Sequence, residues 1–223
     1  MVLEARHIGV VPYDRAVEMQ AELVERRRAG EIPDQLLLLE HPHVITLGAS
    51  GDASHVLADE PARRRLGVDL VETGRGGDVT YHGPGQLVGY PILDLKPDRR
   101  DALRYLRDLE EILIRTLRAF DIEGRRIDDL TGVWVGEGKI AAIGVRISSR
   151  WITSHGFALN VATDLTYFDT IVPCGLQGRE VTSVSDQLGR PVEVSEVVDP
   201  LLLATGEVLG CEIHVVQTTN QVF

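Results

Sequence analysis

Hydrophobic and polar positions recur along the chain with two different periods, and together they predict both helices and strands. Helical spacing over 14–29 predicts a first helix with Asp14 as its N-cap. A second helix is predicted over 101–120 behind Asp101, because its apolar residues return every three or four positions. These residues are Leu103, Leu106, Leu109, Leu113, Leu117 and Phe120.

Other segments show the short apolar runs and the alternation that are typical of strands. Residues 35–39 form a continuous apolar run that predicts a short buried strand, and 68–71 predicts another. Strands at 132–135 and 139–147 are expected to be joined by a tight glycine turn at 136–138. Residues 151–161 predict a third strand of the same sheet.

The C-terminal part predicts one more helix within 195–209. Its start is open, because Pro200 suits the first turn of a helix but not its interior. The predicted order of elements indicates an α+β fold in which helices flank a mixed, largely antiparallel sheet. No linker-like tract or internal repeat interrupts the chain, so we expect residues 1–223 to form a single domain.

Composition and charge exclude several classes of function. The formal net charge is −11, which argues against nucleic-acid binding because a phosphate backbone favours a basic surface. The N-terminus lacks the layout of a signal peptide, and no apolar run is long enough to span a membrane. Two cysteines without zinc-site spacing predict no metal site. We therefore expect a soluble, cytoplasmic protein.

The cationic residues are unequally divided, since 21 of the 23 are arginine and the only lysines are Lys96 and Lys139. Arginine keeps its proton in proteins, whereas a desolvated lysine can release it. A lysine kept in such an arginine-rich chain is therefore a candidate for a group that must titrate. Chance is the alternative explanation for two remaining lysines. Lys96 precedes a proline and has the setting of an ordinary surface residue.

A glycine-rich segment at 75–86 encloses the short strand 79–82. Glycines allow a backbone to approach a ligand closely and expose its N–H groups. Arg75 could pair with an anionic substrate group, and His82, on the opposite face from Tyr81, could donate or accept a proton. The segment matches neither a P-loop nor a dinucleotide fingerprint, and a plain glycine-rich hairpin is an equal alternative.

Three further polar positions draw attention. His155 and Asn160 interrupt an apolar strand, and on that evidence alone a structural role is favoured. Cys174 lies between Pro173 and Gly175, a turn that suits a nucleophile beside its own oxyanion donors, with Lys139 as the candidate cation that lowers the thiol pKa. A small buried side chain is the alternative for Cys174, and Cys211 is interpreted as structural.

Ordered blocks of the sequence resemble one family. The blocks are 40–48, 75–95, 132–135, 139–146, 154–160 and 172–176, and together they are similar to the lipoyl(octanoyl) transferases of the LipB type. The resemblance covers about residues 36–185. It implies the fold of the biotin/lipoate protein ligase catalytic domain, over residues 1–223.

The resemblance also implies a reaction. An octanoyl group would move from octanoyl-acyl carrier protein to a lysine of a lipoyl domain, in 2-oxoacid dehydrogenase complexes or the glycine cleavage H protein. The enzyme would need neither ATP nor a cofactor and would work in the cytoplasm, at the first step of lipoate biosynthesis. Cys174 would carry the acyl group as a thioester, and Lys139 would be its acid/base partner.

The same resemblance implies an acyl pocket whose wall and polar mouth come from the glycine-rich segment and two strands. The implied substrate-binding residues are Arg75, Gly76, Gly77, Asp78, Val79, Thr80, Tyr81, His82, Ala142, Ile143, Gly144, Gly156, Phe157 and Ala158.

Two other functions stay open at this point. An ATP-dependent lipoate or biotin protein ligase would share the fold but would make an acyl adenylate and need no cysteine. A non-catalytic protein that binds an acyl group or a lipoyl domain is the more distant alternative. Cys174 within its block argues against the first, and the Cys174–Lys139 pair argues against the second.

Overall fold

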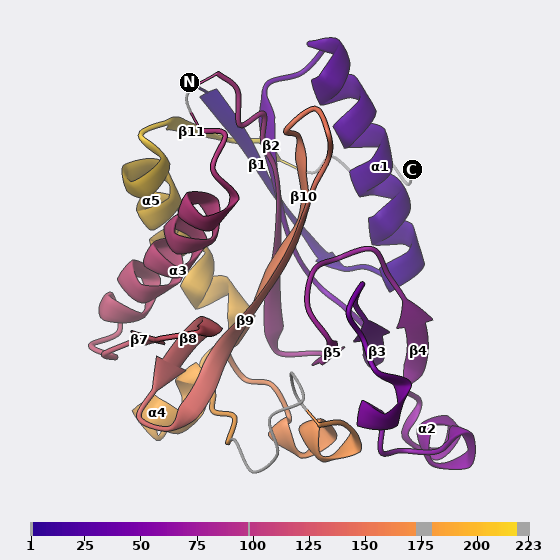
Figure 1. Ribbon diagram of the computed structural model, residues 1–223. Helices are drawn as coiled ribbons and strands as arrows, with labels where there is room; N and C mark the ends of the chain where they lie inside the picture. Colours follow the sequence, from indigo (N-terminus) through magenta and orange to yellow (C-terminus); the bar gives the residue numbers. More distant parts are fainter. Residues whose placement is uncertain (1, 98, 173–179, 218–223) are drawn as a thin grey trace.

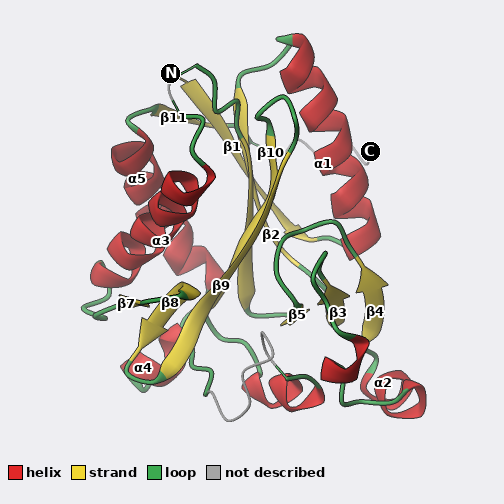
Figure 2. Cartoon of the chain, viewed as in Figure 1, coloured by secondary structure: helices red, strands yellow, loops and turns green. Residues whose placement is uncertain are grey.

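The computed structural model describes residues 2–97, 99–172 and 180–217. In this part of the chain, a mixed eight-stranded sheet carries helices on both faces, and a smaller three-stranded sheet lies beside it (Figures 1 and 2). The strand orders are β11-β1-β2-β6-β10-β9-β8-β7 and β4-β3-β5. The strands are β1 (Val2–Val10), β2 (Asp34–Glu40), β3 (Val44–Leu47), β4 (Asp69–Glu72), β5 (Val79–His82), β6 (Gln86–Ile92), β7 (Arg125–Ile127), β8 (Leu130–Val135), β9 (Gly138–Ile147), β10 (Thr153–Asn160) and β11 (Glu212–Val215). The helices are α1 (Tyr13–Ala29), α2 (Glu60–Leu66), α3 (Ala102–Arg118), α4 (Val184–Leu188) and α5 (Val194–Leu209).

The middle of the eight-stranded sheet is buried on both faces, which explains the continuous run of leucines in β2. Leu36 and Leu38 pack in the core under α3 and α5, whereas Leu37 and Leu39 pack in the core under α1. Successive side chains of a strand point to opposite faces, so a strand between two helical layers needs apolar residues at every position.

The predicted antiparallel strands are confirmed, and they form the part of the sheet that carries the site. β9 pairs with β8 on one side and with β10 on the other, and Phe157 on β10 lies opposite Ile143. β9 runs for ten residues, from Gly138 to Ile147. Lys139 lies near the β8–β9 turn, and Val145 lies near the second sheet. Residues far apart on this strand therefore line a common wall.

The smaller sheet brings the glycine-rich segment against β9. β3 pairs with β4 in parallel and with β5 in antiparallel orientation. The loop between β4 and β5 is fixed by a hydrogen bond from Gly76 N–H to Val145 O (2.8 Å).

The predicted helices are present, but several details differ from expectation. α1 begins after Pro12, and Asp14 lies in its first turn, where its carboxylate accepts from Arg15 N–H. Asp101 does cap α3, through a hydrogen bond from Arg104 N–H. Leu103, predicted to belong to the apolar stripe, is exposed because the stripe turns inward only after the first turn of the helix.

The start of α5 corrects the expectation for Pro200. The helix begins at Val194, so Pro200 lies in its interior. Glu193 and Glu196 form a capping box at the true start, and this signal was missed in the sequence. Strands β1, β3, β6, β7 and β11 and the short helices α2 and α4 were also not predicted.

Among the described residues, no helix combines the length and the apolar character that a membrane crossing requires. The cytoplasmic location stays a prediction.

Candidate active site

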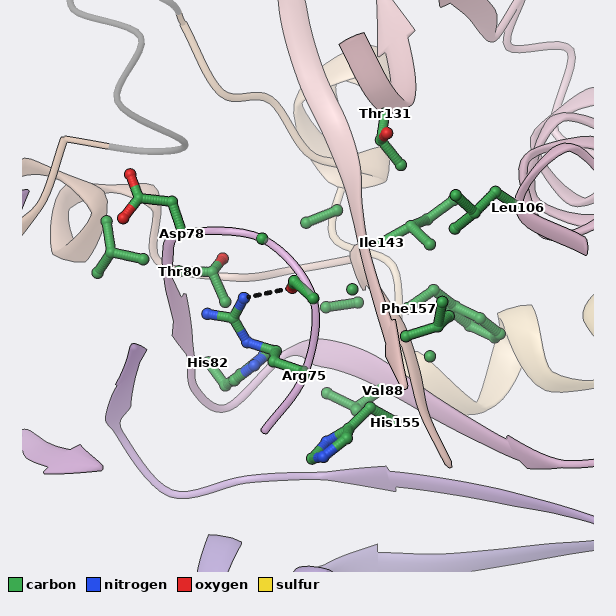
Figure 3. A pocket seen from close by; sticks show the side chains of 18 of the residues that line it. Arg75, Asp78, Thr80, His82, Val88, Leu106, Thr131, Ile143, His155 and Phe157 are labelled. Atoms are coloured by element: carbon green, nitrogen blue, oxygen red, sulfur yellow. Dashed lines mark hydrogen bonds between the residues drawn. The ribbon is translucent and has the colours of Figure 1, made fainter. Parts of the chain in front are cut away.

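A cavity of about 510 Å³ lies between the β9–β10 pair and the loop that precedes β5 (Figure 3). Its size is within the range of small-molecule sites. Ile143, Phe157 and Leu106 form an apolar side, and Figure 3 shows Arg75, Thr80 and His82 across the cavity from them. The cavity can therefore hold an apolar chain beside a polar wall.

Most of the pocket residues expected from the sequence line this cavity. They are Arg75, Gly76, Gly77, Asp78, Val79, Thr80, His82, Ala142, Ile143, Gly144, Gly156, Phe157 and Ala158, together with Lys139. Ten residues were missed: Tyr13, Ser50, Val88, Tyr90, Leu106, Asp129, Leu130, Thr131, Val145 and His155.

Tyr81 is the exception among the expected wall residues, because it does not line the cavity. Its ring packs between Tyr167 and Phe168, and its hydroxyl lies 2.7 Å from His43 Nδ1. Tyr81 and His82 are neighbours on β5, so their side chains point to opposite faces of the strand. The opposite placement predicted for the two side chains is confirmed, but Tyr81 supports the small sheet instead of the wall.

Arg75 holds the glycine-rich loop in place. Its Nε donates to Thr46 Oγ1 (3.0 Å), its Nη2 to Thr46 O (2.6 Å), and its Nη1 to Gly76 O (3.1 Å), the bond drawn in Figure 3. A methyl group on Gly144 would lie 2.8 Å from Gly76 O, so this approach of loop to strand requires glycine. Pairing of Arg75 with an anionic substrate group stays a prediction.

His82 is oriented by a chain of amides. His82 Nδ1 lies 2.7 Å from Gln86 Oε1, Gln86 Nε2 donates to Asn160 Oδ1 (2.9 Å), and Asn160 Nδ2 donates to Thr182 O (3.0 Å). Because the Gln86 oxygen can only accept, His82 donates from Nδ1 and keeps a lone pair on Nε2. Burial lowers the pKa of His82 to about 3, so the ring is a neutral acceptor at pH 7.

Further aromatic and imidazole rings pack around His82, and of these Tyr13 and Tyr90 also line the cavity. Tyr13, at the start of α1, stacks on His82 with ring centroids 6.2 Å apart. His41 donates from Nδ1 to Val11 O (2.7 Å) and accepts from the Tyr90 hydroxyl (2.7 Å). Burial lowers the pKa of His41 to about 4, which keeps this ring neutral as well.

His155 also lines the cavity, although its sequence context favoured a structural role. The backbone N–H of His155 donates to Gln20 Oε1 (2.7 Å). Burial lowers the pKa of the His155 ring to about 4. Its φ of 55° is unusual for a residue other than glycine in a strand. The sequence signal that could have identified His155 as a cavity residue is that it interrupts an otherwise apolar strand.

Lys139 lies at the other end of β9 and is 9% exposed. Its Nζ is 5.0 Å from the centroid of the Trp134 ring. The backbone N–H of Lys139 donates to Glu180 O (2.9 Å), and its backbone carbonyl accepts from Thr182 N–H (3.1 Å). By contrast, the other lysine, Lys96, is a surface residue that pairs with Asp94 (3.4 Å), in agreement with expectation.

Cys174 lies outside the described residues, and only the chain on either side of 173–179 can be placed. Val172 N–H donates to His55 O (2.8 Å), and the His55 ring bonds to Asp78 on the cavity wall (2.5 Å). The returning chain at Glu180 bonds directly to Lys139. Cys211 is half-buried and outside the cavity, and burial raises its thiol pKa.

Comparisons with known proteins agree with this architecture. Residues 12–205 match the family described as the lipoyl protein ligase A/B catalytic domain. A Rubrobacter xylanophilus protein named octanoyltransferase is 55% identical over 210 residues, with 93% of this chain and 94% of the relative covered. A Solibacter usitatus protein of the same name is 56% identical over 192 residues and covers 86% of each chain.

A solved structure supports the fold. The bipartite lipoate protein ligase of Thermoplasma acidophilum superposes with a TM-score of 0.77 at 18% identity, covering 99% of this chain and 89% of the other. The predicted mixed sheet flanked by helices, of the lipoate ligase type, is thus confirmed. The boundaries 1–223 stay a prediction. By the match over residues 12–205 and the identity to both relatives, the chain belongs to the lipoyl protein ligase A/B catalytic-domain family and is an acyltransferase of the octanoyltransferase type.

Proposed function

We propose that this acyltransferase moves an octanoyl group from octanoyl-acyl carrier protein to a lysine of a lipoyl domain, with Cys174 as the acyl carrier and Lys139 as its acid/base partner. The observation that carries the proposal is the placement of Lys139. This buried lysine lies on the wall of an apolar cavity, and its backbone bonds to the chain that follows residues 173–179.

In the first half-reaction, the Cys174 thiolate attacks the thioester carbonyl of the donor. The bond from the carbonyl carbon to the donor sulfur breaks, and the leaving thiolate takes a proton from the Lys139 ammonium. One thioester replaces another of similar energy, so ATP is not required. The apolar side of the cavity, with Ile143 and Phe157, would hold the eight-carbon chain. Each buried CH₂ group would contribute ~0.8 kcal/mol to the free energy of binding.

In the second half-reaction, the lysine amine of the lipoyl domain attacks the Cys174 thioester. An amide bond forms, the Cys174 thiolate leaves, and the attacking nitrogen must lose one proton. Neutral Lys139 accepts that proton, which returns the enzyme to its starting state. Arginine at this position could not serve, because it does not become neutral in proteins.

The proposal is tested by the mass of the intact protein after incubation with octanoyl carrier protein without ATP. We expect a gain of one octanoyl group that hydroxylamine removes. Cys174→Ser and Cys174→Ala should gain nothing, whereas Cys211→Ala, the matched control, should acylate normally. An adduct on Cys211, or a requirement for ATP with free octanoate as expected of a ligase, would contradict the proposal.

Acceptors are tested in the same assay. The acylated protein should lose its octanoyl mass to isolated lipoyl domains of 2-oxoacid dehydrogenase complexes and to glycine cleavage H protein. Substitution of the acceptor lysine by arginine should abolish the transfer, because a guanidinium offers no free amine.

A further inference from the structure

A buried carboxylate on the helix behind the cavity has no role in the reaction proposed above. Glu110 lies on α3 and is 1% exposed. A carboxylate is rarely buried so completely unless both of its oxygens have partners. Both oxygens of Glu110 have partners, and the two oxygens bond to different parts of the protein.

One oxygen faces the surface and the other faces the sheet. Oε2 accepts from Arg107 Nη1 (2.7 Å) and from Arg126 Nε (3.1 Å), which balance the negative charge. Oε1 accepts from the backbone N–H of Gly132 on β8 (3.1 Å) in a buried position. The carboxylate thus ties α3 to a single point on the strand that precedes β9.

Gly132 is a point of tight packing against Lys139. Its φ is 123°, a backbone conformation that residues other than glycine rarely adopt. The β8–β9 register shifts just after it, between Val133 and Trp134. A methyl group on Gly132 would lie 2.6 Å from Ala141 O, 3.3 Å from Lys139 Cε and 3.6 Å from Lys139 Nζ. The Gly132 backbone therefore forms one side of the channel that holds the lysine chain.

We propose that Glu110 is a positioning residue for Lys139, acting through its hydrogen bond to Gly132. It holds the Gly132 backbone at the distance that leaves room for the lysine chain and directs Nζ toward the Trp134 ring and the cavity. Two arginines balance the carboxylate, so its influence on Lys139 is geometric. This inference rests on the function proposed above, in which Lys139 moves a proton.

The test compares Glu110→Ala with Glu111→Ala. Glu111 is the neighbouring carboxylate on α3. It accepts hydrogen bonds from Arg126 (2.8 Å) and Arg115 (3.0 Å), whereas the Gly132 N–H donates to Glu110. We expect Glu110→Ala to lower kcat for transfer to the lipoyl domain by ~10–100-fold while KM stays within about twofold, because a small displacement of a reacting group is costly. Glu111→Ala should leave both constants near the wild-type values.

A second readout needs no substrate. In a Trp151→Phe background, Trp134 is the only tryptophan of the chain, and its emission reports the position of Lys139. We expect Glu110→Ala to shift this emission in the same direction as Lys139→Met, and Glu111→Ala to leave it unchanged. Because this arm is independent of acyl transfer, it decides on positioning even if the wild-type protein proves to have no transferase activity.

Thermal melting shows whether Glu110→Ala folds. If it does not, Glu110→Gln replaces it, since an amide has one acceptor oxygen to share between the arginines and Gly132. The expected changes then have the same direction, with kcat lowered by roughly 3–10-fold. Emission and kcat equal to those of Glu111→Ala, or a change confined to KM, would overturn the inference.

Discussion

Lys139 is held from two sides. Its backbone bonds to Glu180 and Thr182, and its side chain runs between Gly132 and the Trp134 ring. A lysine chain held in this way loses little freedom when its ammonium meets a reacting group. The contrast with Lys96, which lies on the surface beside Asp94, agrees with the compositional argument that singled out two lysines among many arginines.

Replacing Lys139 separates the two half-reactions. Lys139→Arg keeps the positive charge that favours a Cys174 thiolate but removes the ability to accept a proton from the attacking amine. Acylation should partly survive, whereas transfer to the lipoyl domain should fall by ~10²-fold or more. Single-turnover acylation is measured by mass and transfer by gel shift of the lipoyl domain.

Lys139→Ala is the matched variant for this comparison, since it loses the charge as well and should slow both steps. Transfer by Lys139→Arg at the wild-type rate would limit Lys139 to electrostatic support of the thiolate.

At the scale of elements, the segments with a strong period could be predicted and those that depend on distant partners could not. The stripe of α3 and the β8–β9 hairpin carry local signals, namely an N-capping aspartate and a glycine turn. β1 pairs in parallel with both β2 and β11, so its place in the sheet is decided by segments far away in the sequence. In α5 the local sequence misleads. Pro200 indicates a helix start, but packing allows the helix to continue through it.

Packing explains how α5 continues through a proline. Val197, Leu201 and Ala204 are buried on one face of the helix, on both sides of Pro200. The burial of this apolar face outweighs the lost hydrogen bond and the clash of the proline ring, which together cost about 3 kcal/mol in a helix interior.

Replacement of Pro200 should therefore stabilise the protein. Pro200→Ala restores a backbone N–H that can donate to the carbonyl of Glu196, and we expect the free energy of unfolding to rise by about 1–3 kcal/mol. Urea unfolding at pH 7 measures the change, with Ser195→Ala at an exposed position of the first turn as the control. Proline also stabilises the folded protein indirectly, because it restricts the unfolded chain. A urea midpoint at or below that of the wild type would show that this restriction outweighs the restored hydrogen bond.

At the scale of the whole molecule, the cavity is assembled from segments that lie more than a hundred residues apart. The glycine-rich loop and the middle of β9 and β10 were predicted, because those positions lie within sequence blocks that resemble the family. Tyr13 on α1 and Leu106 on α3 were not, since each lies on a helix whose sequence shows only ordinary amphipathic spacing. Their role follows from the packing of α1 and α3 on opposite faces of the sheet (Figure 1).

The same assembly buries three neutral histidines, His41, His82 and His155, and this has a consequence for stability. Burial lowers the pKa of His41 and His155 to about 4 and that of His82 to about 3, whereas an exposed histidine has a pKa near 6.5. Below pH 6.5 the unfolded chain therefore binds protons that the folded protein does not. The stability from these groups is present above pH 6.5 and is lost as the pH falls toward 4.

The expected result is a free energy of unfolding that falls between pH 6.5 and pH 4, with each buried histidine adding up to about 1.4 kcal/mol per pH unit to the slope. His41→Gln should make the slope shallower, because glutamine has no proton to gain in the unfolded chain. His214→Gln, at an exposed position on β11, is the matched control and should leave the slope unchanged. Urea unfolding at half-unit steps of pH measures all three proteins. Equal slopes for the wild type and His41→Gln would show that His41 is protonated in the folded state, contrary to the burial that lowers its pKa.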